Sequence, residues 1–306
     1  MNPVYDCHIH MMPGRCDAPE TFLAKITAAG MTGGSIFSLP PKNTLFYKTG
    51  TTMPEHRERI ANVLDFCRKL PDTFHPFFWL NPTEPDALEQ IRYAKEHGIL
   101  GFKVLCSTYA PLEGLAAYRE CARLGLPVHF HSGILYDGEV SGGFNRPLDF
   151  ECLLEVSGLR FALAHISWPW TDECLALFGK FRSAAGMRSG PAPEMYIDTC
   201  PGAPEFARVD AFRKIGLLPY DAGSRLLFGI DSSVNDYSTD GARRIHEFDR
   251  NAFNKFHAMY SDPVRVHEEV PFTRHGLDAL DFNSIFENAV SVNYLRFIGK
   301  KDGRKQ

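Results

Sequence analysis

The chain has 306 residues, of which 44% are hydrophobic and 23% are charged, and these are ordinary values for a globular protein. Its net charge of −4 gives no electrostatic reason to expect a nucleic acid or an anionic membrane as a partner. The sequence shows no signal peptide, no run of roughly 20 apolar residues and no CxxC pair among its eight cysteines, which predicts a cytoplasmic protein with reduced cysteines.

Short β-rich runs alternate with runs of helical spacing along the chain. We expect strands over 4–10, 33–40, 73–82, 99–106, 126–133, 160–167, 194–200 and 224–233. We expect helices over 19–30, 54–71, 86–98, 112–125, 148–158, 172–186, 206–216 and 284–298. The segment 234–283 shows no clear pattern and leaves room for the last helix of the series.

Eight strands that alternate with helices favour a parallel sheet with right-handed crossovers. At this length the pattern predicts a (β/α)8 TIM barrel, a single domain over residues 1–306 with a C-terminal helix that closes it. An open dinucleotide-binding sheet is disfavoured because no glycine-rich fingerprint follows the first strand, and no Walker-type phosphate loop is present.

Polar residues gather where these strands end. His8 and His10 lie two residues apart, so a regular strand points both imidazoles, and Asp6 with them, to one face. Chemistry in a barrel takes place at the carboxyl ends of its strands, and buried imidazoles and carboxylates there are costly unless they bind something. Imidazole with carboxylate suits a divalent ion, zinc first, with manganese or iron as alternatives. The residues in such positions are His8, His10, Lys103, His131, His165 and Asp231.

Two further polar residues fall within these strands but not at their ends. Asp198 lies two residues before the seventh strand ends, which favours a structural role. His129 faces the same way as His131 but one layer deeper, so we expect it in the core or behind the metal ligands.

The chain resembles the amidohydrolase superfamily, in its branch of amidohydrolase-related TIM-barrel metal-dependent hydrolases. The motifs that carry the resemblance are "DCHIH", "GFKVL", "LPVHFHSG", "ALAHIS", "LLFGIDSS" and "IFENAVSVNYLRF". The resemblance implies one or two metal ions held by His8, His10, His131, His165 and Asp231.

The resemblance also implies roles in catalysis. Asp231 would handle the proton of the attacking water, and His165 could stabilise developing charge rather than bind metal. Lys103 would be either a carboxylated lysine that bridges two ions or an ordinary amine that contacts substrate.

Loop residues after the strands suggest the substrate. Arg15, Tyr136, Trp168 and Trp170 together suit a small planar or carboxylated organic molecule. Three functions remain open: a hydrolase of a C–N, ester or lactone bond, a non-oxidative decarboxylase of an aromatic or unsaturated acid, and a barrel that binds metal or ligand without turnover. A homo-oligomer is possible.

Overall fold

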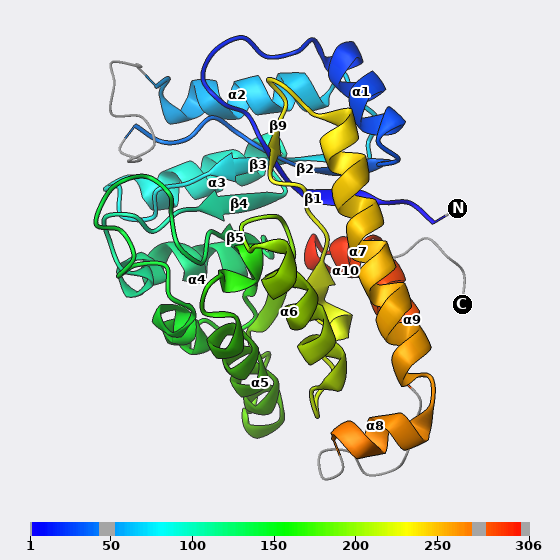
Figure 1. Ribbon diagram of the computed structural model, residues 1–306. Helices are drawn as coiled ribbons and strands as arrows, with labels where there is room; N and C mark the ends of the chain where they lie inside the picture. The colour runs from blue at the N-terminus through cyan, green and yellow to red at the C-terminus, as the bar shows by residue number, and fades with distance from the viewer. Residues whose placement is uncertain (1, 43–52, 271–279, 301–306) are drawn as a thin grey trace.

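A single curled parallel sheet forms the centre of the molecule (Figure 1). The computed structural model describes residues 2–42, 53–270 and 280–300. Within these ranges the strands follow the order β8-β7-β6-β5-β4-β3-β2-β1-β9. Their bounds are β1 (Tyr5–His10), β2 (Gly33–Phe37), β3 (Phe74–Trp79), β4 (Gly101–Val104), β5 (Val128–Phe130), β6 (Arg160–Leu163), β7 (Glu194–Asp198), β8 (Leu226–Leu227) and β9 (Ser232–Ser233).

The eighth predicted strand, 224–233, is broken into β8 and β9, and it closes the sheet. Its first part pairs with β7, where Leu227 lies opposite Asp198, and its last part pairs with β1, where Ser233 lies opposite His10. Between the two, the backbone N–H of Cys7 donates to the carbonyl of Phe228 at 2.9 Å. One segment therefore joins both edges of the sheet, and the predicted single-domain TIM barrel is confirmed.

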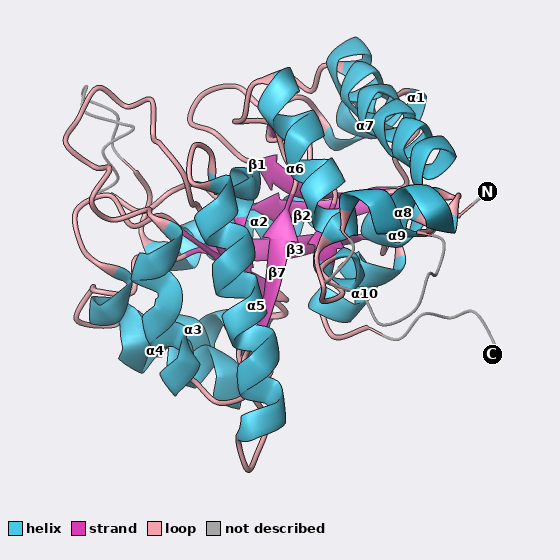
Figure 2. Ribbon diagram, turned by 60° about the horizontal axis from the view of Figure 1, so that its bottom comes forward, coloured by secondary structure: helices cyan, strands magenta, loops and turns pink. Residues whose placement is uncertain are grey.

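Helices surround the strands (Figure 2). They are α1 (Pro19–Ala28), α2 (His56–Cys67), α3 (Ala87–His97), α4 (Leu115–Arg123), α5 (Thr171–Met187), α6 (Glu205–Leu217), α7 (Thr239–Tyr260), α8 (Pro263–Glu269), α9 (Phe282–Ala289) and α10 (Val292–Phe297), with 3₁₀ turns η2 (Pro111–Gly114), η3 (Pro147–Glu155), η4 (Ala164–Ser167) and η5 (Gly223–Arg225). In the described part of the chain, none of these helices has both the length and the apolar character that crossing a membrane requires.

Three helical segments differ from expectation. The helix predicted over 148–158 is the 3₁₀ helix η3, and the helix predicted over 284–298 is split into α9 and α10. The segment without a clear pattern holds α7 and α8. Their N-cap residues are Ser238 and Asp262, whose side chains accept backbone N–H groups.

Two apolar layers lie on either side of the sheet. The outer layer packs Ile9 against helix residues such as Phe22 and Ile26. The inner cluster fills the barrel with Tyr5, Cys7, Phe37, Phe77 and Tyr196, and α10 adds two aromatic rings to it, Tyr294 and Phe297. The ring of Tyr294 stacks on Tyr5 at 4.7 Å between centroids, so α10 closes the barrel at the end where β1 begins.

A register shift between Asp6 and Ile9 reverses the alternation of β1. As a result Cys7 and His8, although adjacent, both face the barrel interior, while Asp6 turns outward. The Asp6 carboxylate accepts hydrogen bonds from the backbone of His8 (3.0 Å) and Ile230 (2.9 Å) and from the hydroxyl of Tyr237 (3.2 Å). Burial raises the pKa of Asp6 to about 7. The prediction that Asp6 shares a face with the two histidines is therefore wrong.

Candidate metal centre

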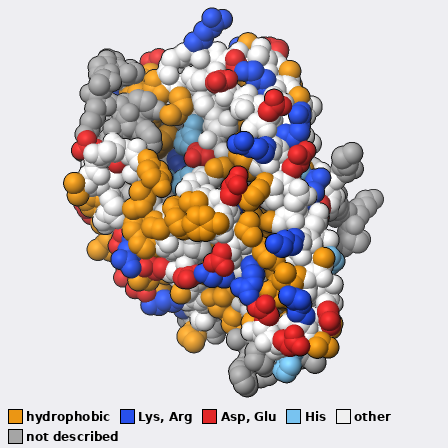
Figure 3. Space-filling view, in the orientation of Figure 1, with side chains coloured by type: hydrophobic (Ala, Val, Ile, Leu, Met, Phe, Trp, Pro, Cys, Tyr) orange, Lys and Arg blue, Asp and Glu red, His pale blue; other side chains and the backbone are white. Residues whose placement is uncertain are grey.

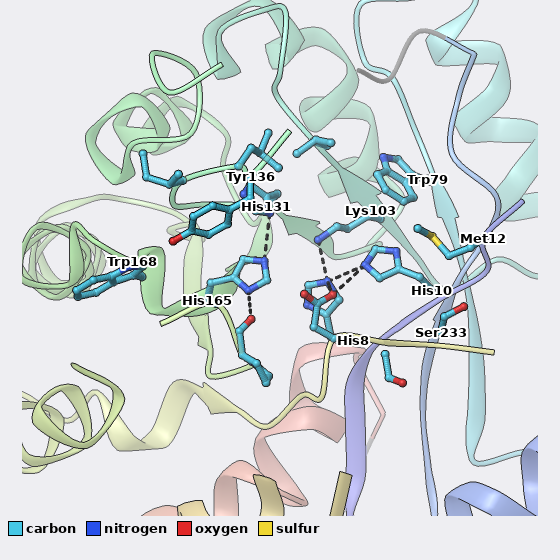
Figure 4. A pocket seen from close by; sticks show the side chains of 17 residues that line it. His8, His10, Met12, Trp79, Lys103, His131, Tyr136, His165, Trp168 and Ser233 are labelled. Carbon is cyan, nitrogen blue, oxygen red and sulfur yellow. Dashed lines mark hydrogen bonds and ion pairs between the residues drawn. The ribbon is translucent and has the colours of Figure 1, made fainter. Parts of the chain in front are cut away.

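The strand ends bring the predicted polar residues to one pocket of about 340 Å³. Figure 3 shows the hollow from outside, with histidine side chains visible at its floor, and Figure 4 shows the side chains that line it. Of the predicted site residues, those that line the pocket are His8, His10, Lys103, His131, Tyr136, His165, Trp168 and Asp231.

Three of these residues, His8, His10 and Asp231, place their ligand atoms at the spacing that a metal ion requires. His8 Nε2 lies 3.0 Å from His10 Nε2, and Asp231 Oδ1 lies 3.4 Å from the first and 3.3 Å from the second. Atoms that bind one tetrahedral zinc ion at about 2.0–2.1 Å lie about 3.3 Å from each other. The donor set and its spacing therefore fit a divalent metal ion.

His8 is held so that its Nε2 atom is free to bind. Its Nδ1–H donates to Asp198 Oδ2 at 2.7 Å, and a carboxylate can only accept, so the neutral ring carries its lone pair on Nε2. Burial and then the charge of Lys103 lower the pKa of His8 well below its usual range. Burial also lowers the pKa of His10. Neutral imidazoles are the form that binds metal.

His165 and His131 form a second pair in the pocket. His165 Nδ1–H donates to the carbonyl of Pro201 at 2.6 Å, and its Nε2 lies 3.1 Å from His131 Nδ1. Burial lowers the pKa of His131 well below its usual range, and its buried Nε2 has no hydrogen-bond partner. His165 lies in η4, where it and the next two residues have φ values of 61°, 48° and 54°. This left-handed backbone turns the imidazole into the pocket at the cost of local strain.

Lys103 reaches the pocket from β4 and is 2% exposed. Its Nζ lies 3.2 Å from His8 Nε2, and it extends between the two histidine pairs in Figure 4. Burial lowers the pKa of Lys103, an effect that Asp231 opposes. An amine with a lowered pKa beside metal-binding groups fits both of the roles predicted for it.

Asp231 follows the break in the eighth strand and has a φ of 55°. Burial acts to raise the pKa of its carboxyl group, but the imidazoles of His8 and His10 outweigh this, so the pKa lies well below its usual range. The carboxylate is partly open to solvent, with 33% of its side chain exposed. It can therefore meet a water molecule in the pocket.

The loop residues predicted to bind substrate divide into two groups. Tyr136 and Trp168 line the pocket, whereas Trp170 and Arg15 are not among its lining residues. Arg15 is exposed, and Trp170 lines a separate surface hollow with Phe206 and stacks near the guanidinium of Arg146. Their predicted contact with substrate is not supported by this placement.

Apolar side chains complete the lining of the pocket. They are Met12, Trp79, Leu105, Ile134 and Leu135. Trp79 is the last residue of β3, and its ring lies 5.1 Å from that of His10. It reaches the pocket from the end of its strand, as the polar residues of the site do.

Cys200 is a neighbour of the site that the sequence did not suggest. Its Sγ lies 3.1 Å from His8 Nδ1 and 3.2 Å from His165 Nδ1, so the three side chains could form a metal-binding group. Both Nδ1 atoms, however, already donate to Asp198 and Pro201. Cys200 therefore packs behind the two imidazoles and does not fit a ligand of the same ion.

A family comparison agrees with this arrangement. The model of the amidohydrolase family matches residues 5–252. The chain belongs to the amidohydrolase family. No curated protein sequence matches it.

Solved structures of three bacterial proteins are similar in fold to this amidohydrolase. A TIM-barrel protein from Bordetella bronchiseptica is 15% identical with a TM-score of 0.60, and the match covers 97% of this chain and 100% of the other. An amidohydrolase from Burkholderia multivorans is 12% identical with a TM-score of 0.54, covering 97% and 99%. Dihydroorotase from Campylobacter jejuni is 12% identical with a TM-score of 0.54, covering 99% and 85%.

Proposed function

We propose that the protein is a metal-dependent hydrolase that acts on a C–N, ester or lactone bond of a small organic molecule. The convergence of His8, His10 and Asp231 at the floor of a pocket supports this proposal most directly. The family to which the chain belongs is consistent with a hydrolase.

His8, His10 and Asp231 would hold the ion, and the His131–His165 pair lies close enough to complete the site or to hold a second ion. A divalent ion such as zinc lowers the pKa of water that it binds to about 7 and polarises a carbonyl group. The pocket supplies the remaining functions through its own side chains.

Asp231 would take the proton of the attacking water and pass it to the leaving group. Its low pKa keeps the group ionised, which is the form that a proton acceptor needs. His165 has its ring fixed by the Pro201 carbonyl, and in its imidazolium form its Nε2–H would stabilise negative charge that develops on the substrate oxygen. Lys103 would add positive charge on the same side when its amine is protonated.

The pocket walls favour a flat, largely apolar substrate. Trp79, Leu105 and Trp168 offer apolar surfaces, and polar groups lie at the floor and on Tyr136, Ser232 and Ser233. A small carboxylated aromatic substrate would place its ring between the indoles of Trp79 and Trp168 and its carboxylate towards Lys103.

Metal content and product analysis test the proposal. Protein from cells grown with zinc or manganese is expected to carry one or two ions per chain. It is then incubated with panels of amides, esters, lactones and aromatic acids. A new carboxylate together with an amine or alcohol supports the hydrolase, and release of CO2 instead would establish the decarboxylase. Bound metal without turnover of any panel would indicate a binding protein, and absence of metal would overturn the metal site itself.

A further inference from the structure

The last residue of β7 and the four residues that follow it lie behind the histidines of the candidate metal site. In this segment, residues 198–202, Asp198 binds Nδ1 of His8 and the Pro201 carbonyl binds Nδ1 of His165. His8 lies on β1 and His165 lies in η4, which follows β6, so one segment orients histidines from two parts of the barrel.

The fit of the 198–202 segment leaves little freedom. A methyl group on Gly202 would lie 2.8 Å from the ring of His165. The backbone N–H of Cys200 donates to Asp198 Oδ1 at 2.8 Å, which fixes the carboxylate that faces His8. Small displacements of this segment must therefore be transmitted to both imidazoles.

A buried ion pair holds the segment in place. Arg208, on α6, makes two hydrogen bonds to Asp249, on α7, with Nε–Oδ1 at 2.7 Å and Nη2–Oδ2 at 2.5 Å. Its remaining terminal nitrogen, Nη1, donates to the carbonyl of Thr199. The two side chains are 5% and 1% exposed. The guanidinium thus ties two helices to the centre of the 198–202 segment.

We propose that Arg208 and Asp249 are positioning residues of the metal centre, which they serve by fixing the 198–202 segment and through it the rings of His8 and His165. This inference rests on the proposed metal site. Stability alone does not explain a buried ion pair, because both charges lose their hydration on folding. Apolar side chains of similar volume often stabilise the folded state as well or better. The contact with the Thr199 carbonyl is the part that an apolar pair cannot replace.

The double variant Arg208→Met with Asp249→Leu separates positioning from stability. It replaces the pair with apolar side chains and leaves no buried charge unpaired, but it loses the hydrogen bond to the Thr199 carbonyl. We expect the dissociation constant for Zn²⁺, measured by competition with a chromophoric chelator, to rise about 10- to 100-fold. The unfolding midpoint is measured on the same samples, so that only folded protein is compared.

Arg213→Met is the matched control. Arg213 lies on the same helix and also reaches α7, where its Nε donates to the hydroxyl of Tyr260 at 2.9 Å. Its hydrogen-bond partners lie outside the 198–202 segment. Loss of the Arg213 side chain should therefore leave the Zn²⁺ dissociation constant within about twofold of the wild-type value. If the double variant does not fold, Arg208→Lys takes its place, since a lysine cannot reach Asp249 and Thr199 with the same fork of donors.

The outcomes distinguish this inference from the proposed function. Unchanged Zn²⁺ affinity in the folded Arg208 variants would overturn the positioning role while leaving the metal site intact. Equal losses in the Arg208 and Arg213 variants would overturn it too, because they would reflect the packing of α6 on α7 in general. A wild-type protein that binds no Zn²⁺ would overturn both.

Discussion

Asp231 would combine two tasks at the residue scale, since it lies among the candidate metal ligands and is proposed to accept a proton. Asp231→Asn keeps an oxygen that can face the ion but removes the basic carboxylate. We expect metal content to remain near the wild-type value and kcat to fall about 100- to 10,000-fold. Elemental analysis beside steady-state kinetics checks this, and a variant that retains most of its kcat would show that another group moves the proton.

Gly229 shows how closely the eighth strand passes behind His8. A methyl group at this position would lie 2.9 Å from Asp198 Oδ1, 3.0 Å from Cβ of His8 and 3.1 Å from Cβ of Cys200. Gly229→Ala must therefore push the Asp198–His8 hydrogen bond apart. We expect a loss of about 1–3 kcal/mol in the free energy of unfolding and weaker Zn²⁺ binding.

Urea unfolding and chelator competition measure the two effects of Gly229→Ala. Gly186→Ala provides the control, because nothing lies within 4 Å of a methyl group placed there in α5. It should keep wild-type metal affinity and gain up to about 1 kcal/mol in stability. Equal behaviour of the two variants would contradict the close packing inferred around His8.

At the scale of elements, α10 is tied to the sheet through a polar contact as well as through its aromatic rings. The Tyr294 hydroxyl lies 2.8 Å from Nδ1 of His75, on β3, and 2.9 Å from Oγ of Ser35, on β2. Burial, followed by the charge of Lys300, lowers the pKa of His75 to about 3. The closing helix therefore docks against a histidine that stays neutral in the folded protein.

This docking predicts a pH dependence of stability. The unfolded chain binds a proton at His75 below about pH 6.5, whereas the folded chain does not do so until about pH 3. The unfolded state thus holds more protons within this window, and stability falls as the pH is lowered through it. His75 should account for about 2 kcal/mol of the loss between pH 7 and pH 5.

Urea titrations of the wild type and of His75→Gln at both pH values check this contribution. The variant is expected to be less stable at pH 7 but to lose less stability on acidification. His267→Gln, at an exposed position on α8, should follow the wild type. Parallel pH profiles for wild type and His75→Gln would rule out a role for this histidine in acid sensitivity.

The order and type of most elements could be predicted from sequence because each of these strand–helix units carries its own apolar spacing. Two local features could not. The register shift in β1 depends on the neighbouring strands and on the hydrogen bond between Asp6 and the distant backbone of Ile230. Regular alternation therefore assigned Asp6 to the wrong face. The break in the eighth strand arises because its two parts pair with different partners.

At the scale of the whole molecule, the candidate site collects side chains from strands that span most of the chain. Parallel strands in a barrel must end at the same side, so the meeting of His8, His10 and Asp231 followed from the strand assignments. The partnership of His8 with Asp198 did not, because 190 residues separate the two and no local pattern joins them. The positions of Arg15 and Trp170 depend on loop conformation, which carries no periodic signal.

Metal binding should stabilise the entire fold, because the ion would connect the first and the last strand of the barrel. An ion at 1,000 times its dissociation constant contributes about 4 kcal/mol. Removal by a chelator is expected to lower the melting temperature on the order of 10 °C, and added Zn²⁺ should restore it. His10→Gln, measured in parallel by differential scanning calorimetry, should be insensitive to the chelator. A wild-type melting temperature that does not change when the chelator is added would contradict an ion between the first and the last strand.

The broken last strand has a consequence for the order in which the site is completed during synthesis. During synthesis the ribosome delivers all four pocket histidines well before the segment that bears Asp231. A growing or truncated chain that stops short of residue 226 therefore has imidazoles but lacks the carboxylate proposed to take a proton from water. Because that same segment joins both edges of the sheet, a chain that ends before it would lack both the closed barrel and the proposed proton acceptor.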